Sequence, residues 1–473
     1  MRVLRAFHAA RGLCHVLCVS ALGLLVGCGG GGGIEGEVQT PPPVQTVDLM
    51  ISGNAVTKVR TAGGVVAFLQ ERLTSIFEAG PQRTLAILQA DGHTVRSYNA
   101  PAGWSIADFA VHPGGDVSVV LTTAKEVRIV RVDRAASIGS DQMFVDPDAA
   151  TDPFYDYEGG VRDANSLQPV LMHDAARLVP LGDSLVLVLR TGLNAVVAYR
   201  LDRDVTGGYR RAWRTLVEPG SSILGIGITS GSFDTFGQLQ NHLRIHVDVD
   251  SARTLAIGLV DAPHRNSTFR AHAEYFGEPI AASKGVLVDR VATDDGRRIG
   301  STAIDTHVQA ELHGLRATPS GFGLVGRVFS EERPDGTGWN AFVAFVARDG
   351  SPGAYSVVDV DRGDVLFDIA ALPGGGRYVA VGTTGYTQNP TGASISESSQ
   401  PLLALLNADG SLARQLGYPG GPRQNQISSI ASFNGAWLLA GMADGPGTHS
   451  GDLQPALITA NGFLQADPDI PTQ

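Results

Sequence analysis

The chain has 473 residues, of which 18% are charged and 59 are glycine, and its formal net charge at pH 7 is −11. An acidic chain without a basic cluster disfavours nucleic acid and anionic lipid surfaces as partners. The charged share lies below the usual value of about 25% and the glycine share above the usual ~7%. This balance favours many short strands joined by tight turns over helices.

The first segment has the parts of an export signal. Arg2, Arg5 and Arg11 give residues 1–12 a positive charge that no acidic residue offsets, and an apolar run follows at 13–27. A bilayer-spanning helix needs roughly 20 apolar residues, so this run is too short to be a stable anchor. We therefore expect a signal peptide over residues 1–27.

The apolar run ends in Leu25-Val26-Gly27-Cys28, which resembles the lipobox of bacterial lipoproteins. The resemblance implies cleavage before Cys28 and attachment of lipid to that cysteine, which becomes the new N-terminus. Gly29 follows it, and by resemblance to the sorting pattern of Gram-negative lipoproteins this residue implies the outer membrane, on its periplasmic or its surface side. An ordinary signal peptide cut nearby is the alternative.

The residues after Cys28 are suited to a tether. Glycine fills positions 29–33 and proline fills 41–43, a composition that forms neither helix nor strand cheaply. All three cysteines lie at or before residue 28, so the mature chain would have no disulfide. Removing residues 1–27 takes away three arginines and no acid, which moves the net charge to about −14. We expect a lipidated tether over 28–45 and one folded domain over 46–473.

An internal repeat runs through this domain. Each copy has an apolar strand, a Gly/Pro turn, a second apolar strand often ending in glycine, a variable loop, and a third strand closing on an Asp-Gly turn. The first turns of six copies fall near Gly63, Gly114, Gly182, Gly321, Gly375 and Gly435. A degenerate copy is expected within 220–300, where 223–228, 243–249 and 254–260 are strand-like. The mean spacing is then 62 residues, and seven modules fill the domain.

Modules that cannot bury both faces alone are expected to stack radially. Residues 366–420 resemble the repeat of bacterial delta-60-type propellers, through an apolar strand and the phrase Leu406-Asn-Ala-Asp-Gly-Ser-Leu412. The expectation is an all-β fold, a β-propeller of seven blades, as a monomer, with residues 47–51 closing the ring against the last module. A pair of β-sandwiches is the alternative.

Catalytic motifs are absent from the sequence. It contains no Gly-x-Ser-x-Gly, Ser-x-x-Lys, His-Glu-x-x-His or Gly-x4-Gly-Lys-Ser/Thr pattern. No catalytic residue and no cofactor is predicted, although propeller enzymes often scatter their residues across blades.

One acidic segment is a candidate calcium site. Clustered carboxylates in a loop can supply the six to eight oxygens that Ca²⁺ prefers. The candidates are Asp146, Asp148, Asp152, Asp156 and Glu158. Their spacing lacks the periodicity of a known calcium loop, which favours a solvated acidic insertion.

Two further sequence patterns each have a simpler interpretation. Strand alternation would place His242, His246, Asp248 and Asp250 on one face as a metal site, but a polar outer face of a half-buried strand explains them as well. The segment 335–339 slightly resembles the Asp-box of sialidase-type propellers. A packing role for Trp339 is the simpler interpretation.

Two hypotheses for function follow. The first is a lipid-anchored, non-enzymatic binding or scaffold module that presents loops at 141–170, 262–284, 329–340 and 384–400 to a protein or polysaccharide. The alternative is an extracytoplasmic enzyme, glycan-active or a quinone-dependent dehydrogenase, with carboxylates, His or Arg converging in the central funnel. The sequence favours binding.

Overall fold

The computed structural model describes part of the chain, all of it within the compact unit Pro41–Gln473. The described residues are 45–47, 54–72, 82–90, 94–123, 126–146, 148, 176–190, 195–219, 245–260, 268–280, 282, 284–329, 338–360, 363–372, 376–385, 400–417, 426–433, 436–444 and 453–459.

The described strands form seven antiparallel four-stranded sheets. The first sheet consists of β2 (Asn54–Ala62), β3 (Val65–Arg72), β4 (Gln82–Leu88) and β5 (Val95–Asn99). The second consists of β6 (Ser105–Val111), β7 (Val117–Thr122), β8 (Val127–Val132) and β9 (Ile138–Phe144). The third consists of β10 (Ala176–Leu181), β11 (Ser184–Arg190), β12 (Val196–Arg203) and β13 (Tyr209–Glu218).

The remaining sheets repeat this order. The fourth consists of β14 (His246–Val249), β15 (Thr254–Val260), β16 (Gly285–Ala292) and β17 (Arg298–Asp305), with α2 (Thr268–Phe276) between β15 and β16. The fifth consists of β18 (Ala310–Thr318), β19 (Gly321–Phe329), β20 (Trp339–Ala347) and β21 (Pro352–Val358). The sixth consists of β22 (Val365–Ala371), β23 (Tyr378–Thr384), β24 (Gln400–Leu406) and β25 (Leu412–Gly417). The seventh consists of β26 (Gln426–Phe433), β27 (Ala436–Asp444), β28 (Leu453–Thr459) and β1 (Gln45–Val47).

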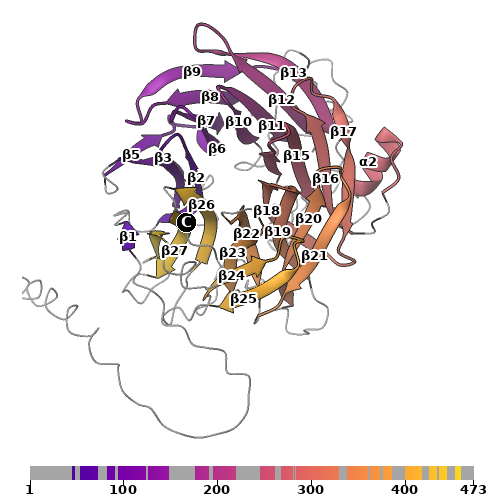
Figure 1. The fold of residues 1–473 in the computed structure, drawn as a ribbon. Coiled ribbons are helices and arrows are strands. Elements are labelled where there is room, and N and C mark those ends of the chain that lie inside the picture. The colour runs from indigo at the N-terminus through magenta and orange to yellow at the C-terminus, as the bar shows by residue number, and fades with distance from the viewer. Residues whose placement is uncertain are drawn as a thin grey trace, which may run out of the picture. The chain divides into compact units, whose positions relative to one another are not determined.

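The first strands of the sheets meet in a closed cycle. β2 contacts β6, and the contacts continue through β10, β14, β18, β22 and β26 back to β2. The sheets therefore radiate as blades around a common axis, as Figure 1 shows. This arrangement confirms the predicted all-β propeller class, and the sandwich alternative is wrong. The degenerate copy expected within 220–300 is the fourth sheet; the segment 223–228 lies outside the described residues.

The ring is closed by the start of the folded domain. β1 pairs antiparallel with β28, and Gln45 lies opposite Thr459. The seventh blade thus combines three strands from the end of the chain with one from its beginning. The closing strand was predicted at 47–51; the pairing is present, but the strand begins at Gln45, and 48–53 lie outside the described residues.

Apolar side chains fill the space between neighbouring blades. Strands β7, β15 and β23 are buried along their whole length, because each is covered by a sheet on both faces. Each core cluster draws its members from two adjacent blades, as where Val120 of the second packs with Leu187 of the third. Burial of one such side chain contributes roughly 1.5–3 kcal/mol. The blades therefore stabilise one another rather than folding alone.

The four-strand order separates two ends of the ring. Connections from first to second and from third to fourth strands share one end, which we call the turn end. Connections from second to third strands and between sheets share the other, the loop end. At the turn end the predicted Asp-Gly turns are confirmed: Gly410 has φ +84°, a conformation that suits glycine, and Asp409 accepts a hydrogen bond from the Ser411 amide.

Among the described residues, no helix combines the length and the apolar character needed to cross a membrane.

Candidate functional site at the ring axis

Polar side chains gather on the first strands, where the blades meet. Because a buried charge is costly unless it is paired, this set is the first place to look for function. We call it the axial ring: Lys58 and Arg60 on β2, Asp108 on β6, Arg177 on β10, Asp248 on β14, Arg316 on β18, Asp368 on β22 and Ser429 on β26. Positive and negative members alternate from β2 to β22, and Ser429 fills the seventh position.

A β-bulge positions four members of the axial ring. The register between first and second strands shifts immediately before each of them, namely Lys58, Asp108, Asp368 and Ser429. A bulge bends its strand and re-aims the following side chain. The four side chains consequently occupy equivalent places on four blades.

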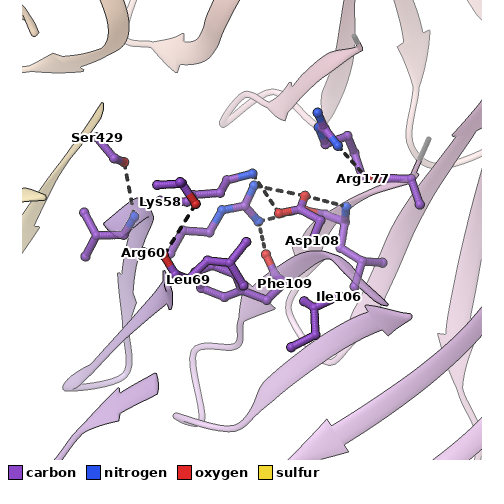
Figure 2. Close-up of polar contacts among 12 residues, drawn as sticks. Lys58, Arg60, Leu69, Ile106, Asp108, Phe109, Arg177 and Ser429 are labelled. Atoms are coloured by element: carbon purple, nitrogen blue, oxygen red, sulfur yellow. Dashed lines mark hydrogen bonds and ion pairs between the residues drawn. The ribbon is translucent and has the colours of Figure 1, made fainter. Parts of the chain in front are cut away.

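Asp108 links three blades, as Figure 2 shows. Its Oδ1 accepts a hydrogen bond from Lys58 Nζ at 2.7 Å, and its Oδ2 accepts one from the Leu178 amide at 3.0 Å. Arg60 Nη2 lies 3.5 Å from the same carboxylate. Arg60 Nη1 also donates to the carbonyl oxygens of Phe109 and Leu178. These bonds join β2, β6 and β10.

Asp368 has the same role on the other side of the ring. Arg316 donates hydrogen bonds from Nε to its Oδ1 and from Nη2 to its Oδ2, each at 2.8 Å. Its Oδ2 accepts bonds from Ser429 Oγ at 2.7 Å and from the Ile430 amide at 3.1 Å. Ser429 Oγ in turn accepts a bond from the Val59 amide at 3.2 Å. The chain of bonds joins β18, β22, β26 and β2.

The same backbone contact recurs at Asp248. Its Oδ2 accepts a hydrogen bond from the Ala317 amide at 2.8 Å, which joins β14 to β18. Asp108, Asp248 and Asp368 therefore each accept a bond from a backbone N–H on the first strand of the next blade. An ionised carboxylate strengthens such a bond.

The neighbouring charges hold the carboxylates of Asp108 and Asp368 ionised. Burial alone would raise the pKa of Asp108, but the positive charges of Arg60, Lys58 and Arg177 outweigh it and hold that pKa well below its usual range. The pKa of Asp368 is likewise lowered, because Arg316 outweighs the effect of burial. Burial and the charge of Arg60 lower the pKa of Lys58 to about 7.

The hydrogen bonds of the axial ring bear on what its charged residues can do. The enzyme hypothesis required charged residues converging on the axis, and such residues do converge there. Both oxygens of Asp108 and of Asp368 accept hydrogen bonds, most of them from residues of neighbouring blades. These hydrogen bonds connect neighbouring blades to one another.

The calcium candidates are only partly described. Asp146 is buried and accepts hydrogen bonds from Arg211 at 2.8 Å, Arg214 at 2.9 Å and Tyr199 at 2.8 Å. Asp148 pairs with Arg211 at 2.6 Å. Arginine thus supplies positive charge at these two carboxylates. Asp152, Asp156 and Glu158 lie outside the described residues, and calcium binding there stays a prediction.

The described residues of 242–250 do not bring their polar side chains together as a metal site. Asp248 turns to the axis, whereas Asp250 accepts a bond from the Thr254 amide at 2.8 Å and lies 3.4 Å from Arg348. Ile245 and Val247 are buried, as the half-buried strand interpretation predicts, but Asp250, which that interpretation placed on a polar outer face, is buried too. His242 lies outside the described residues.

Trp339 packs at the start of β20. Arg327 lies over its ring at 4.3 Å, and Phe329 meets it edge-on at 5.5 Å. The packing interpretation is confirmed for this residue; 335–337 lie outside the described residues.

One group of metal-type ligands was not found from the sequence. Glu218, His272 and Asp289 are buried, and one ligand atom from each lies within 4.8 Å of the others. The three residues are far apart in sequence and lie on β13, α2 and β16. No short spacing motif links them, so only the fold brings them together.

Known proteins with similar structures share little sequence with this chain. No protein family matches the sequence, and no curated protein matches it. The β-propeller domain of the Trilobed protease from Pyrococcus furiosus is 10% identical with a TM-score of 0.41, over 89% of this chain and 96% of that one. Chaetomium thermophilum Sqt1, bound to the N-terminus of ribosomal protein L10, is 10% identical with a TM-score of 0.42, over 87% and 98%.

A third structure, a putative 6-phosphogluconolactonase from Bacteroides uniformis, is 12% identical with a TM-score of 0.44, over 83% of this chain and 95% of that one. At these scores none of the three carries an argument about function. The assignment of this chain to the β-propeller fold rests on its own strand pairing.

Proposed function

We propose that this protein is a lipid-anchored, extracytoplasmic binding module that recognises a protein or polysaccharide through the loop end of its propeller. Cys28 would carry the lipid and residues 28–45 would form the tether. The resemblance of 25–28 to a lipobox and the glycine and proline content of the tether support the anchor.

The main support for a binding role is that the long connections between strands begin and end at the same end of the propeller. β9 ends at Phe144, inside the range 141–170, and the other three loops follow the ends of β15, β19 and β23. All four connections are of the type that starts and finishes at the loop end. Loops gathered on one end of a rigid scaffold are a common way to build a recognition surface.

The bonding at the axis supports the same role. The carboxylates of Asp108, Asp248 and Asp368 accept backbone hydrogen bonds from the next blade. Their charge is therefore used to hold the ring together. A rigid ring pre-organises loops and reduces the entropy lost when they bind.

The test replaces one loop at a time. Purified chain is screened against cell-envelope polysaccharides and cross-linked to intact cells to identify what it captures. Replacing 386–399 by a Gly/Ser linker of equal length, or likewise 330–337, is expected to reduce capture at least tenfold with unchanged melting temperature. A matched control changes the turn end, Asp409→Asn, and should leave capture unaltered. Capture that survives every loop replacement would refute the proposal.

A further inference from the structure

The group Glu218, His272 and Asp289 lies where α2 meets the third and fourth blades. Glu218 is the last residue of β13, His272 lies on α2, and Asp289 lies in the middle of β16. Their side chains are 3%, 0% and 0% exposed. Phe269, also on α2, is buried in the core between the same two blades, which fixes the helix at this place.

The ligand atoms are close to the separations that a small metal ion requires. His272 Nδ1 lies 2.8 Å from Glu218 Oε2 and 4.0 Å from Asp289 Oδ1. Zinc binds nitrogen and oxygen at about 2.0–2.2 Å in a tetrahedron, which places its ligand atoms about 3.3 Å apart. The two observed distances bracket that value, and all three ligand atoms lie within 4.8 Å of one another. Shifts of no more than about 1.5 Å would therefore bring them around one ion.

Asp289 gives an independent indication that a positive charge belongs here. Its Oδ2 atom is buried and accepts no hydrogen bond from the residues that the structure describes, while its Oδ1 accepts bonds from Ser301 Oγ and Arg298 Nη2. A buried carboxylate oxygen without a partner is costly, and a bound cation would remove that cost.

The surroundings also contain an outer partner for the imidazole. Glu278 Oε2 lies 3.4 Å from His272 Nε2. A metal on Nδ1 would shift the imidazole proton to Nε2, where Glu278 can accept it; this carboxylate–histidine arrangement is common behind metal ligands. Arg298 now lies 3.2 Å from both Nε2 and Asp289. It also contacts Glu278 at 3.3 Å, which keeps its charge paired when a cation neutralises Asp289.

We propose that Glu218, His272 and Asp289 bind one divalent transition-metal ion of the zinc class, which ties β13, α2 and β16 together. The ligand set of one imidazole and two carboxylates suits zinc better than calcium, which prefers six or more oxygens. The ion would cross-link two blades through the helix and stabilise that part of the loop end. This inference does not depend on the binding function proposed above.

The test uses the untagged full-length chain, stripped with a chelator and dialysed. Titration with Zn²⁺ should show one binding site and a higher melting temperature. Titration with Co²⁺ should give the intense visible absorption of a tetrahedral site at one equivalent. Asp289→Asn is expected to weaken the binding of Zn²⁺ and of Co²⁺ at least tenfold. The matched control is Glu311→Gln, a buried carboxylate paired with Arg327, which should bind metal like the wild type.

Two results would overturn the inference. One is a wild-type chain that gives no stoichiometric cobalt spectrum, a result that stands whether or not any variant folds. The other is an Asp289→Asn chain that folds and binds cobalt as the wild type does. His272→Gln provides a second ligand variant, and its binding should also fall at least tenfold.

Discussion

At the scale of single residues, Asp108 and Asp368 look anomalous in the sequence and are explained by the fold. Each is the one charged residue in an apolar stretch that opens a repeat, 106–111 and 365–371. Sequence periodicity identifies the strand but not the bulge that aims the side chain at the axis. The alternation of charge around the axis could not be predicted, because it arises between strands about 60 residues apart.

The first prediction concerns the countercharge at the axis. Asp108→Asn leaves Lys58 and Arg60 without their carboxylate, and Asp108 is only 1% exposed. Breaking a buried ion pair from one side typically costs about 3–5 kcal/mol, so we expect a loss of that size in the free energy of unfolding measured with urea.

Asp141→Asn is the matched control for this experiment. Asp141 pairs with Arg128 at the surface and is 41% exposed, and such pairs contribute about 1 kcal/mol or less. Equal losses in the two variants would contradict the role assigned to Asp108.

The second prediction is an acid sensitivity with a defined origin. The folded-state pKa values of Asp108 and Asp368 lie below the ordinary value of 3.8, because neighbouring cations outweigh burial. The unfolded chain therefore binds more protons, and this stabilisation is full above about pH 5 and is lost progressively as the pH falls below about 4 towards the folded-state pKa values. Urea midpoints at pH 7, 5, 4 and 3 should fall accordingly, and less steeply in Asp108→Asn. Parallel curves for the two proteins would argue against this origin.

At the scale of elements, the glycine that ends the second strand of a repeat has a structural cause. Gly326, Gly382 and Gly441 each lie opposite the residue that precedes or begins the bulge of the first strand. A Cβ atom at Gly382 would lie 1.9 Å from the carbonyl oxygen of Val365. The repeat made these glycines visible in the sequence, but their reason depends on a contact that only strand register determines.

The third prediction tests this close approach. Gly382→Ala forces the backbone of β22 and β23 apart, and overpacking of this kind costs about 1–3 kcal/mol. The expected result is a lower urea midpoint and a lower melting temperature. Gly376→Ala is the control, since no atom lies within 4 Å of its Cβ position, and its stability should change little or rise slightly. If Gly382→Ala proved as stable as the control, the steric explanation would fail.

At the scale of the whole molecule, composition and repeat spacing were enough to predict the propeller, because every blade reuses one strand pattern. Closure of the ring by the start of the domain was also predicted, at 47–51, whereas the observed strand β1 spans Gln45–Val47. The Glu218–His272–Asp289 group could not be predicted from the sequence, because it joins a strand end, a helix and a neighbouring blade. Lipid attachment at Cys28 stays a prediction from resemblance.

The fourth prediction concerns that attachment. Cys28→Ala should abolish incorporation of labelled palmitate and release the protein from the membrane fraction of the bacterium that produces it. Cys18→Ala, within the apolar run, is the control and should keep both. Palmitate incorporation that persists in Cys28→Ala would show that the lipid is attached elsewhere.

The central claim is that the axis holds the propeller together while the loop end binds. The most direct test compares Asp368→Asn with the replacement of 386–399, measuring melting temperature and partner capture for both. We expect Asp368→Asn to melt several degrees lower and, below its melting temperature, to capture the partner as the wild type does. We expect the loop variant to melt as the wild type does and to lose partner capture. An Asp368→Asn protein that melts like the wild type but no longer captures the partner would contradict the claim and place the binding site at the axis.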